Sequence, residues 1–290
     1  MDIKINPKTH IMNLKNSVFF FVILISLLSC GGSNDVVDDN PIIAETCSAK
    51  VVSAIPTGTN TVLVWAEEFD TDGSPCSDNW TYDLGAGGWG NGEAQYYTRD
   101  NVVVNNGILK ITAKKEVFNG SQYTSTRMLT KGKFQFTYGK VEVRAKLPKG
   151  GGTWPAIWML GSNISTVGWP ACGEVDIMEH VGNNQGTTQS AMHTPSSYGA
   201  TVNLGSQYLN DVSTAFHVYS VEWTAKKMIF AVDGNVHYTY NPSTKNSDTW
   251  PFDANQFIIL NIAMGGSFGG TIDPNFTESS MEIDYVRVYQ

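Results

Sequence analysis

Apolar and polar residues alternate with a period of two along much of the chain from about residue 60 onward. In residues 140–148, valine, alanine and leucine occupy every second position, and Glu142, Arg144 and Lys146 stand between them. A period of two places alternate side chains on opposite faces of an extended strand. This segment is therefore predicted to be a strand with one buried and one exposed face.

Short strands of the same kind follow one another to the C terminus. Residues 217–223 alternate again, and the β-rich runs 228–232 and 236–240 are joined by the turn sequence Asp-Gly-Asn. The final strand is expected to place five residues on one side: Met281, Ile283, Tyr285, Arg287 and Tyr289. No helical stripe of three turns interrupts these strands, so we expect an all-β sandwich or barrel.

The first 29 residues have the pattern of an export signal. Three lysines precede the apolar run 18–28, which is shorter than the roughly 20 residues that a membrane-spanning helix needs. Ser29 directly before Cys30 resembles the lipobox at which a bacterial signal peptidase cuts, leaving a lipidated cysteine. We therefore expect an exported lipoprotein, attached to the membrane through lipid on Cys30.

The sequence thus divides into three regions. Residues 1–29 are the lipoprotein signal peptide, 30–58 the lipidated N terminus with a flexible tether, and 59–290 a folded domain. The tether begins with the small and acidic residues 31–41, which lack periodic apolar positions. These residues resemble tags that send lipoproteins to the outer membrane and the cell surface, so we expect that location and leave the leaflet open.

Composition supports the prediction of a β protein and argues against some classes of binding partner. The chain has 28 glycines, 11% aromatic and 16% charged residues, as in glycine-turned β proteins. Its net charge is −8, and removal of residues 1–29, with three lysines and one aspartate, would make it −10. An acidic chain without clusters of Lys or Arg argues against nucleic acid and disfavours a sulfated polysaccharide.

Besides the lipidated Cys30, three cysteines remain after processing. We expect two of them to form a disulfide and the third to be a free thiol. Cys47 and Cys76 flank the first strand in turn-like surroundings, and export permits a disulfide, so we expect them to pair. Cys172 is expected to stay a buried free thiol. The five histidines do not stand at the spacings of zinc ligands.

The stretch GEVDIMEH, residues 173–180, carries three carboxylates in what is otherwise a core strand. In a regular strand Glu174 and Asp176 share a face, whereas Glu179 points to the opposite one. A single β-bulge between Asp176 and Glu179 would shift the parity and bring all three acids to one face. Glu174 and Glu179 would then lie about four strand steps, roughly 13 Å, apart in the backbone. Their side chains could close this to the ~5–5.5 Å between the carboxyl groups of a retaining glycosidase.

Such a cluster has a chemical purpose. Three like charges on one face repel one another, so one acid is expected to hold a proton at neutral pH. A general acid and an ionised nucleophile can then coexist. The alternative is a solvated acidic strand edge or a calcium site, but the intervening Val175, Ile177 and Met178 make the other side of the strand apolar.

Motifs around this strand carry a specific resemblance. The following segments stand in order along residues 62–290: WAEEFD, GGWGNGEAQYYT, YGKVEVRAKLPKGGGTWPAIWML, GWPACGEVDIMEHVG, AMHT, FHVYSVEWT, LNIAMGGSFGG and MEIDYVRVYQ. Together they resemble glycoside hydrolase family 16 in its laminarinase-like branch, with the signature E-x-D-x-x-E. The resemblance implies a β-jelly-roll sandwich of two curved antiparallel sheets, concanavalin A-like, with a concave substrate cleft, and makes 59–290 the catalytic domain.

The same resemblance assigns roles to the acids. Glu174 matches the nucleophile, Asp176 the assisting acid and Glu179 the acid/base of a retaining endo-hydrolysis of β-1,3-glucan. His193 matches a histidine close to the acid/base, with a satisfied core histidine as the alternative. No cofactor is required for this chemistry.

Five further residues are candidates for substrate binding by this resemblance. Trp154 and Trp158 are placed at the subsites nearest the cut bond, because indole rings suit the apolar faces of pyranoses. Trp169 is a third candidate platform. Asn91 and Arg127 are candidates for hydrogen bonds to sugar hydroxyls, with an ordinary surface residue as the alternative for each.

Two further points concern the family pattern. Several members carry a structural calcium ion on the convex face, and here Glu68, Gly107 and Asp284 occupy the corresponding motifs with oxygen ligands that suit calcium. Phe268 stands in GGSFGG where many members have tryptophan, which leaves a smaller distal platform.

Three functions remain open on the sequence. The first is an endo-β-1,3-glucanase. The second is a family 16 hydrolase of mixed-linkage β-1,3-1,4-glucan or of an algal galactan, which would share the acids. The third is a non-catalytic glucan-binding lipoprotein, against which the presence of both Glu174 and Glu179 argues. We expect a monomer.

Overall fold

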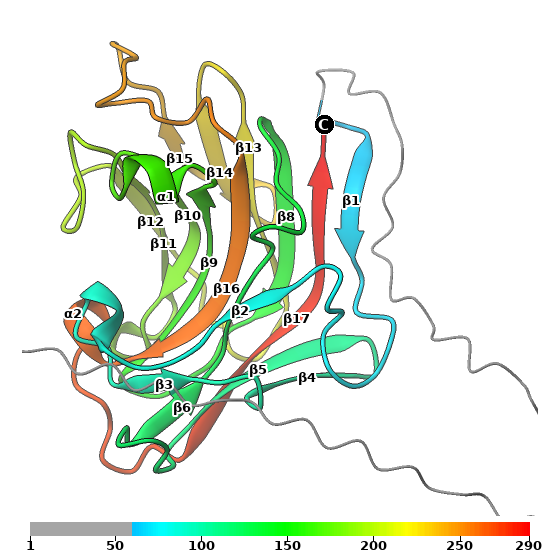
Figure 1. The fold of residues 1–290 in the computed structure, drawn as a ribbon, viewed down its shortest axis with the longest axis vertical. Coiled ribbons are helices and arrows are strands. Elements are labelled where there is room, and N and C mark those ends of the chain that lie inside the picture. Colours follow the sequence, from blue (N-terminus) through cyan, green and yellow to red (C-terminus); the bar gives the residue numbers. More distant parts are fainter. Residues whose placement is uncertain (1–59) are drawn as a thin grey trace, which may run out of the picture. The chain divides into compact units, whose positions relative to one another are not determined.

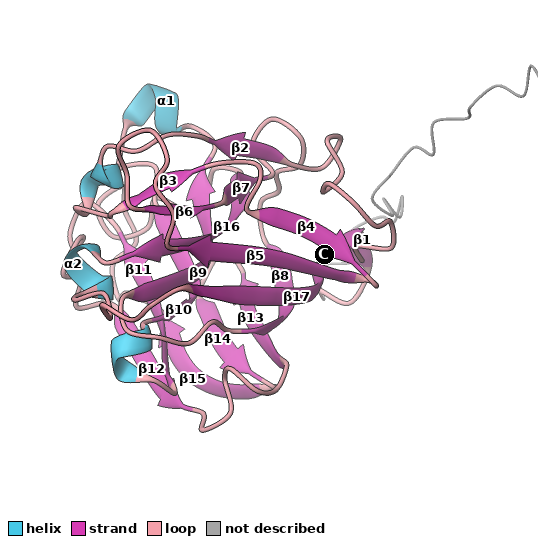
Figure 2. Ribbon diagram, turned by 90° about the horizontal axis from the view of Figure 1, so that it is seen from below, coloured by secondary structure: helices cyan, strands magenta, loops and turns pink. Residues whose placement is uncertain are grey.

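The computed structural model describes residues 60–290, which form two β-sheets packed against each other (Figure 1, Figure 2). This confirms the all-β, jelly-roll prediction. The predicted signal peptide, 1–29, and tether, 30–58, lie outside the described residues. Within residues 60–290, no helix is long and apolar enough to cross a membrane.

The larger sheet has ten strands, and almost all of its neighbours are antiparallel. Its strands are β1 (Leu63–Glu67), β3 (Gln95–Tyr97), β4 (Val102–Asn105), β5 (Ile108–Lys114), β6 (Tyr123–Ser125), β8 (Gly139–Lys146), β13 (His217–Trp223), β14 (Met228–Val232), β15 (Asn235–Tyr240) and β17 (Glu278–Tyr289). They run in the order β15-β14-β13-β8-β17-β5-β6-β3, with β1 beside β17 and β4 beside β5. The predicted hairpin between β14 and β15 is confirmed.

The second sheet has seven strands and curves strongly (Figure 1). Its strands are β2 (Thr81–Asp83), β7 (Arg127–Leu129), β9 (Thr153–Gly161), β10 (Glu174–His180), β11 (Thr187–His193), β12 (Leu204–Tyr208) and β16 (Gln256–Met264), in the order β12-β11-β10-β9-β16-β7-β2. The helical pieces of the described chain are single turns: α1 (Ile164–Val167), α2 (Gly266–Gly269) and the 3₁₀ turns η1 (Gly88–Gly90) and η2 (Gly182–Asn184).

The main core fills the space between the two sheets. Strand β8 alternates buried and half-buried residues as its sequence predicts, and Val141, Val143 and Ala145 have no exposed surface. Strand β16 is buried at all nine positions, because its other face covers a second, smaller cluster. Cys172 belongs to that cluster and is a buried free thiol, as expected.

The last strand departs from its predicted pattern. A β-bulge lies between Ile283 and Tyr285 in the pairing of β17 with β8. Ile283 is therefore buried, but the next buried residues are Val286 and Val288. The prediction that one side of this strand runs unbroken to its end was wrong, because the bulge shifts the parity.

Cys76 forms a disulfide bond. Its predicted partner, Cys47, lies outside the described residues, and this pairing stays a prediction.

Candidate active site

The bulge predicted in the acidic strand is present in β10. Against β11, the pairing advances three residues along β10, from Asp176 to Glu179, while β11 advances by two. Against β9, the shift falls between Asp176 and Met178. The extra residue restores the parity, so Glu174, Asp176 and Glu179 face the same side of the sheet and act on one another electrostatically.

His193 on β11 stands opposite Glu174 and completes the cluster. Its Nε2 lies 3.1 Å from Oδ2 of Asp176 and 3.6 Å from Oε1 of Glu174. His193 and Glu179 also act on each other electrostatically, although the direct contacts of the imidazole are with the other two acids. Atoms of Glu174, Asp176 and His193 lie within 4.8 Å of one another, close enough to share a metal ion.

Electrostatics favour a proton on the imidazole of His193. Burial lowers the pKa of His193, but contact with Asp176 and the charges of Asp176, Glu174 and Glu179 outweigh it and raise this pKa to about 9. The protonated imidazole is a cation that favours the ionised form of Glu174.

The two glutamates are held away from their ordinary titration range. Burial, and then repulsion from Asp176, raises the pKa of Glu174 to about 8 and that of Glu179 to about 7. The two carboxyls, both close to Asp176, together hold a proton near neutral pH. We place that proton on Glu179, because His193 contacts Glu174 and stabilises its negative charge.

Glu174→Gln should raise the melting temperature, and more so at higher pH. In the unfolded chain both glutamates have the ordinary pKa of 4.5, whereas in the fold burial and Asp176 raise the pKa of Glu174 to about 8 and that of Glu179 to about 7, so the two carboxyls share a proton up to neutral pH. Ionising the Glu174 carboxyl therefore lowers the free energy of unfolding, and by more as pH rises from 4.5 to 8. Each kcal/mol of relief corresponds to roughly 2–4 °C in a domain of this size. Thermal melts at pH 4.5 and 8 check this, with exposed Glu278→Gln as control. A gain that is equal at both pH values would contradict it.

Tryptophans from β9 and from the α1–β10 connection donate directly to the glutamates. Trp154 Nε1 donates to Oε1 of Glu179 at 2.9 Å, and Trp169 Nε1 donates to Oε2 of Glu174 at 2.9 Å. Gln189 of β11 donates to the other oxygen of Glu179 at 3.1 Å. Each glutamate is thus fixed in orientation. Trp169 is 45% exposed, which leaves its ring available to a ligand.

Trp158 connects the site to the glycine-rich loop. Its Nε1 donates to Asn261 at 2.7 Å, Asn261 donates to the Tyr97 hydroxyl at 3.1 Å, and that hydroxyl donates to Glu93 at 3.2 Å. Glu93 also accepts a 3.0 Å hydrogen bond from the exposed Asn91. Asn91 is therefore placed at the solvent end of a chain of hydrogen bonds that begins at Trp158.

Arg127 packs against two aromatic rings and also forms an ion pair with Asp83. Its guanidinium lies 4.7 Å from the Trp158 ring centroid and 5.1 Å from that of Trp89, and its Nε is 3.0 Å from Asp83. Arg127 thus braces the loop against β9 by cation–π contacts. This is a role that the sequence analysis did not assign to it.

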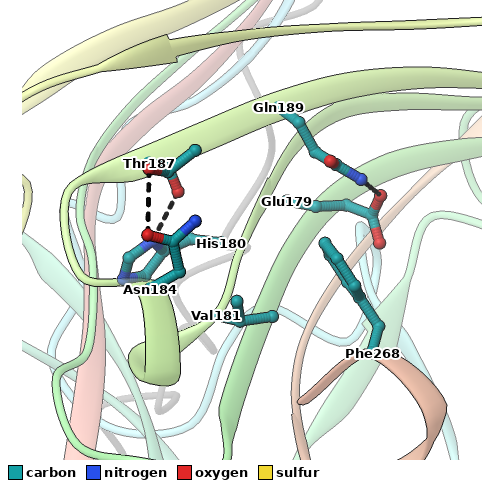
Figure 3. A pocket seen from close by; sticks show the side chains of 7 residues that line it. All are labelled: Glu179, His180, Val181, Asn184, Thr187, Gln189 and Phe268. Atoms are coloured by element: carbon teal, nitrogen blue, oxygen red, sulfur yellow. Dashed lines mark hydrogen bonds between the residues drawn. The ribbon is translucent and has the colours of Figure 1, made fainter. Parts of the chain in front are cut away.

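Phe268 of α2 borders a pocket next to Glu179 (Figure 3). Its ring meets that of Trp154 edge-on at 5.4 Å between centroids. Gln189 and Asn184 line the same pocket. The phenylalanine therefore occupies a place beside the acid/base candidate, which makes the departure from tryptophan relevant to ligand binding.

Two residues of the site were missed by sequence analysis. Gln189 lies four positions before His193, so strand alternation places both side chains on one face of β11. The sequence could therefore have identified Gln189. Asn261 is a polar residue within the apolar strand β16, which also marks it. Both positions are explained by their bonds to the side chains of Glu179 and Trp158.

Two of the three residues suggested for calcium form ion pairs with arginines. Glu68 forms two hydrogen bonds to Arg287, at 2.8 and 2.9 Å, and Asp284 is paired with Arg144 at 2.5 Å. Gly107 lies in the turn between β4 and β5. Each carboxylate thus has an arginine partner, and the calcium site stays a prediction.

Comparison with known proteins agrees with the geometry. The family profile "Glycosyl hydrolases family 16" matches residues 91–287. A "Beta-glucanase" of Rhodothermus marinus is 44% identical over 244 residues, which cover 79% of this chain and 85% of the relative. The laminarinase structure from Flavobacterium sp. UMI-01 is 48% identical with a TM-score of 0.75, covering 79% of this chain and 100% of that one.

A third similarity is to SCLam, described as a non-specific endo-β-1,3(4)-glucanase. Its structure is 41% identical with a TM-score of 0.74, covering 84% of this chain and 96% of that one. The profile spans most of the described domain, and the two solved structures share its fold. The chain belongs to glycosyl hydrolase family 16.

Proposed function

We propose that this glycoside hydrolase cleaves internal β-1,3 linkages of laminarin-type glucan with retention of anomeric configuration. The observation that carries the proposal is the bulge in β10, which brings Glu174 and Glu179 to one face with a proton available to the pair. The similar proteins described as a laminarinase and a β-glucanase support the substrate class.

In the first step Glu179 protonates the leaving glycosidic oxygen while a Glu174 oxygen attacks the anomeric carbon. The C–O bond to the leaving sugar breaks, and a glycosyl-enzyme ester forms on Glu174. Trp169 and the His193 cation orient Glu174 and keep it ionised for this attack. Trp154 and Gln189 hold Glu179 in place.

In the second step water replaces the first product. Glu179, now ionised, removes a proton from the water as it attacks the anomeric carbon, and Glu174 leaves as a carboxylate. Two inversions give net retention. The charge of Asp176 raises the pKa of Glu179, which keeps this acid protonated for the first step.

Asp176→Asn should move the alkaline limb of the pH profile to lower pH. The negative charge of Asp176 raises the pKa of Glu179, so neutralising it lowers that pKa and removes the catalytic proton earlier as pH rises. Measurement of kcat/KM against pH on laminarin checks this. An unmoved or upward-shifted limb would mean that Asp176 does not tune the acid.

The anchored location is also a proposal, based on the N-terminal pattern. We propose that Cys30 carries lipid and holds the domain at the outer membrane. Labelled palmitate should be incorporated by the wild-type chain in bacterial cells and not by Cys30→Ser. Incorporation into both, or into neither, would overturn the assignment.

The substrate is tested by assaying reducing-end release from laminarin, mixed-linkage barley glucan, agarose and carrageenan, with Glu174→Ser alongside. We expect release from laminarin that the substitution abolishes. Activity confined to barley glucan or a galactan would keep the mechanism and replace the substrate. Binding of laminarin without release from any polymer would make the protein a glucan-binding lipoprotein.

A further inference from the structure

The bulge that assembles the acids is matched by a single residue on the neighbouring strand. Where β10 inserts Ile177 and Met178 between its paired positions, β11 supplies only Ser190. Ser190 has no exposed surface, and its Oγ donates a 2.7 Å hydrogen bond to the carbonyl oxygen of Ile177. A bulge interrupts the ladder of backbone hydrogen bonds, and a buried carbonyl left without a donor is costly. The serine hydroxyl supplies a donor to this carbonyl within the bulge.

A second bulge, in the other sheet, reaches the same serine. Between the pairs Ala231–Val236 and Phe230–Tyr238, β15 carries one additional residue, His237. His237 Nε2 lies 3.0 Å from Oγ of Ser190. The hydroxyl proton is already committed to Ile177, so His237 must donate through Nε2–H.

The other ring nitrogen agrees with this assignment. His237 Nδ1 is buried and has no hydrogen-bond partner among the described residues, as expected for the bare acceptor of a neutral ring. Burial lowers the pKa of His237, which also favours the neutral form. The chain of donors therefore runs from His237 to Ser190 to Ile177.

Close packing brings β15 to this point. Gly205 of β12 pairs with Ser190, and a Cβ on Gly205 would lie only 2.6 Å from the side chain of Tyr238. The absence of a side chain at Gly205 allows Tyr238 to pack there, which sets the neighbouring His237 against Ser190. Two bulged strands of different sheets thus meet at one hydroxyl.

We propose that Ser190 and His237 are positioning residues, which hold the β10 bulge in the register that keeps Glu179 on the same face as Glu174. A slip of one residue would turn Glu179 to the opposite face. The kinetic part of this inference rests on the proposed function.

Ser190→Ala tests the proposal in the full chain. We expect kcat on laminarin to fall by about 10- to 100-fold while KM stays within roughly twofold, because misplacement of a catalytic group by about 1 Å has costs of this order. The alkaline limb of kcat/KM should also move, since it reports the surroundings of Glu179. Loss of melting temperature with unchanged kcat and pH profile would overturn the proposal.

Ser213→Ala is a matched control. Ser213 Oγ also donates to a backbone carbonyl, that of Pro148 at 3.1 Å, and accepts from a side chain, Gln185 at 2.7 Å. It shows no contact with the acids. This variant should keep wild-type kcat and pH profile, and an equal loss of kcat in it would show that the Ser190 effect is not specific to the bulge.

If Ser190→Ala does not fold, variants of His237 test the positioning role. Gln can place its Nε2 near the histidine Nε2, so His237→Gln should stay within about twofold of wild-type kcat. His237→Leu lacks the donor and should lose roughly 3- to 10-fold, a smaller effect because Ser190 keeps its bond to Ile177. Equal kcat in the two variants would overturn the role of His237.

Failure of the proposed function can be distinguished from failure of this inference. If the wild type cleaves none of the four polymers, the proposed function fails, and the Glu179 titration followed by carbon-13 NMR still tests the positioning role. Wild type and Ser190→Ala should then differ in this titration. Identical titrations would contradict the inference.

Discussion

Glu174→Gln is expected to lower kcat on β-1,3-glucan by about 10⁵-fold or more, the scale seen when an enzyme nucleophile is removed. The amide keeps the size of the side chain and can still accept from Trp169, but it cannot form the glycosyl ester. KM should change little, because the sugar-binding surface remains. The initial rate of reducing-end release from laminarin measures the effect.

The exposed Glu278→Gln provides the control for this loss and should leave the rate unchanged. A fall of only 10-fold in Glu174→Gln would show that this carboxylate assists the reaction without forming the covalent bond. Combined with the higher melting temperature expected for the same variant, the result would show that burying this carboxyl beside Asp176 costs stability and serves catalysis.

Glu179→Gln is expected to lower kcat on laminarin by about 10²- to 10⁴-fold, the usual contribution of general acid–base catalysis. Its effect should depend on the leaving group, unlike that of Glu174→Gln. A dinitrophenyl β-glucoside oligomer departs without a proton, so formation of the glycosyl-enzyme should be nearly as fast as in the wild type. Pre-steady-state release of dinitrophenol measures this step.

Equal losses on laminarin and on the aryl substrate would contradict the role of Glu179. The orientation of Glu179 by Trp154 and Gln189 predicts that the variant keeps its fold, since one amide oxygen can still accept a bond. The roles of the two glutamates are thus distinguished by the response to the leaving group and not only by the size of the rate loss.

Sequence patterning predicted the parts of the structure in which burial dictates residue choice. The alternation in β8 identified its buried face, and the conflict between parity and three acids located the bulge in β10. Both inferences use the two-residue period of a strand. The bulge in β17 was missed because Asp284 lies at the surface, where a polar residue gives no conflict of parity.

Contacts between distant strands were beyond the sequence pattern. The pairing of strands brings an arginine to Glu68 and another to Asp284, and neither ion pair was predicted. In the sequence Ser190 and His237 have no distinguishing feature. Their contact depends on two bulges in different strands. Such pairings depend on the register of both sheets, which no single segment contains.

The most direct test of the account is to identify the residue that carries the covalent intermediate. A 2-deoxy-2-fluoro laminaribiosyl fluoride slows the second step, so the glycosyl-enzyme should accumulate and can be located by mass spectrometry of peptic peptides. The account predicts a label on Glu174, with a β-configured sugar as the first product of normal turnover. A label on Asp176 or Glu179, or turnover with inversion and no label, would contradict it.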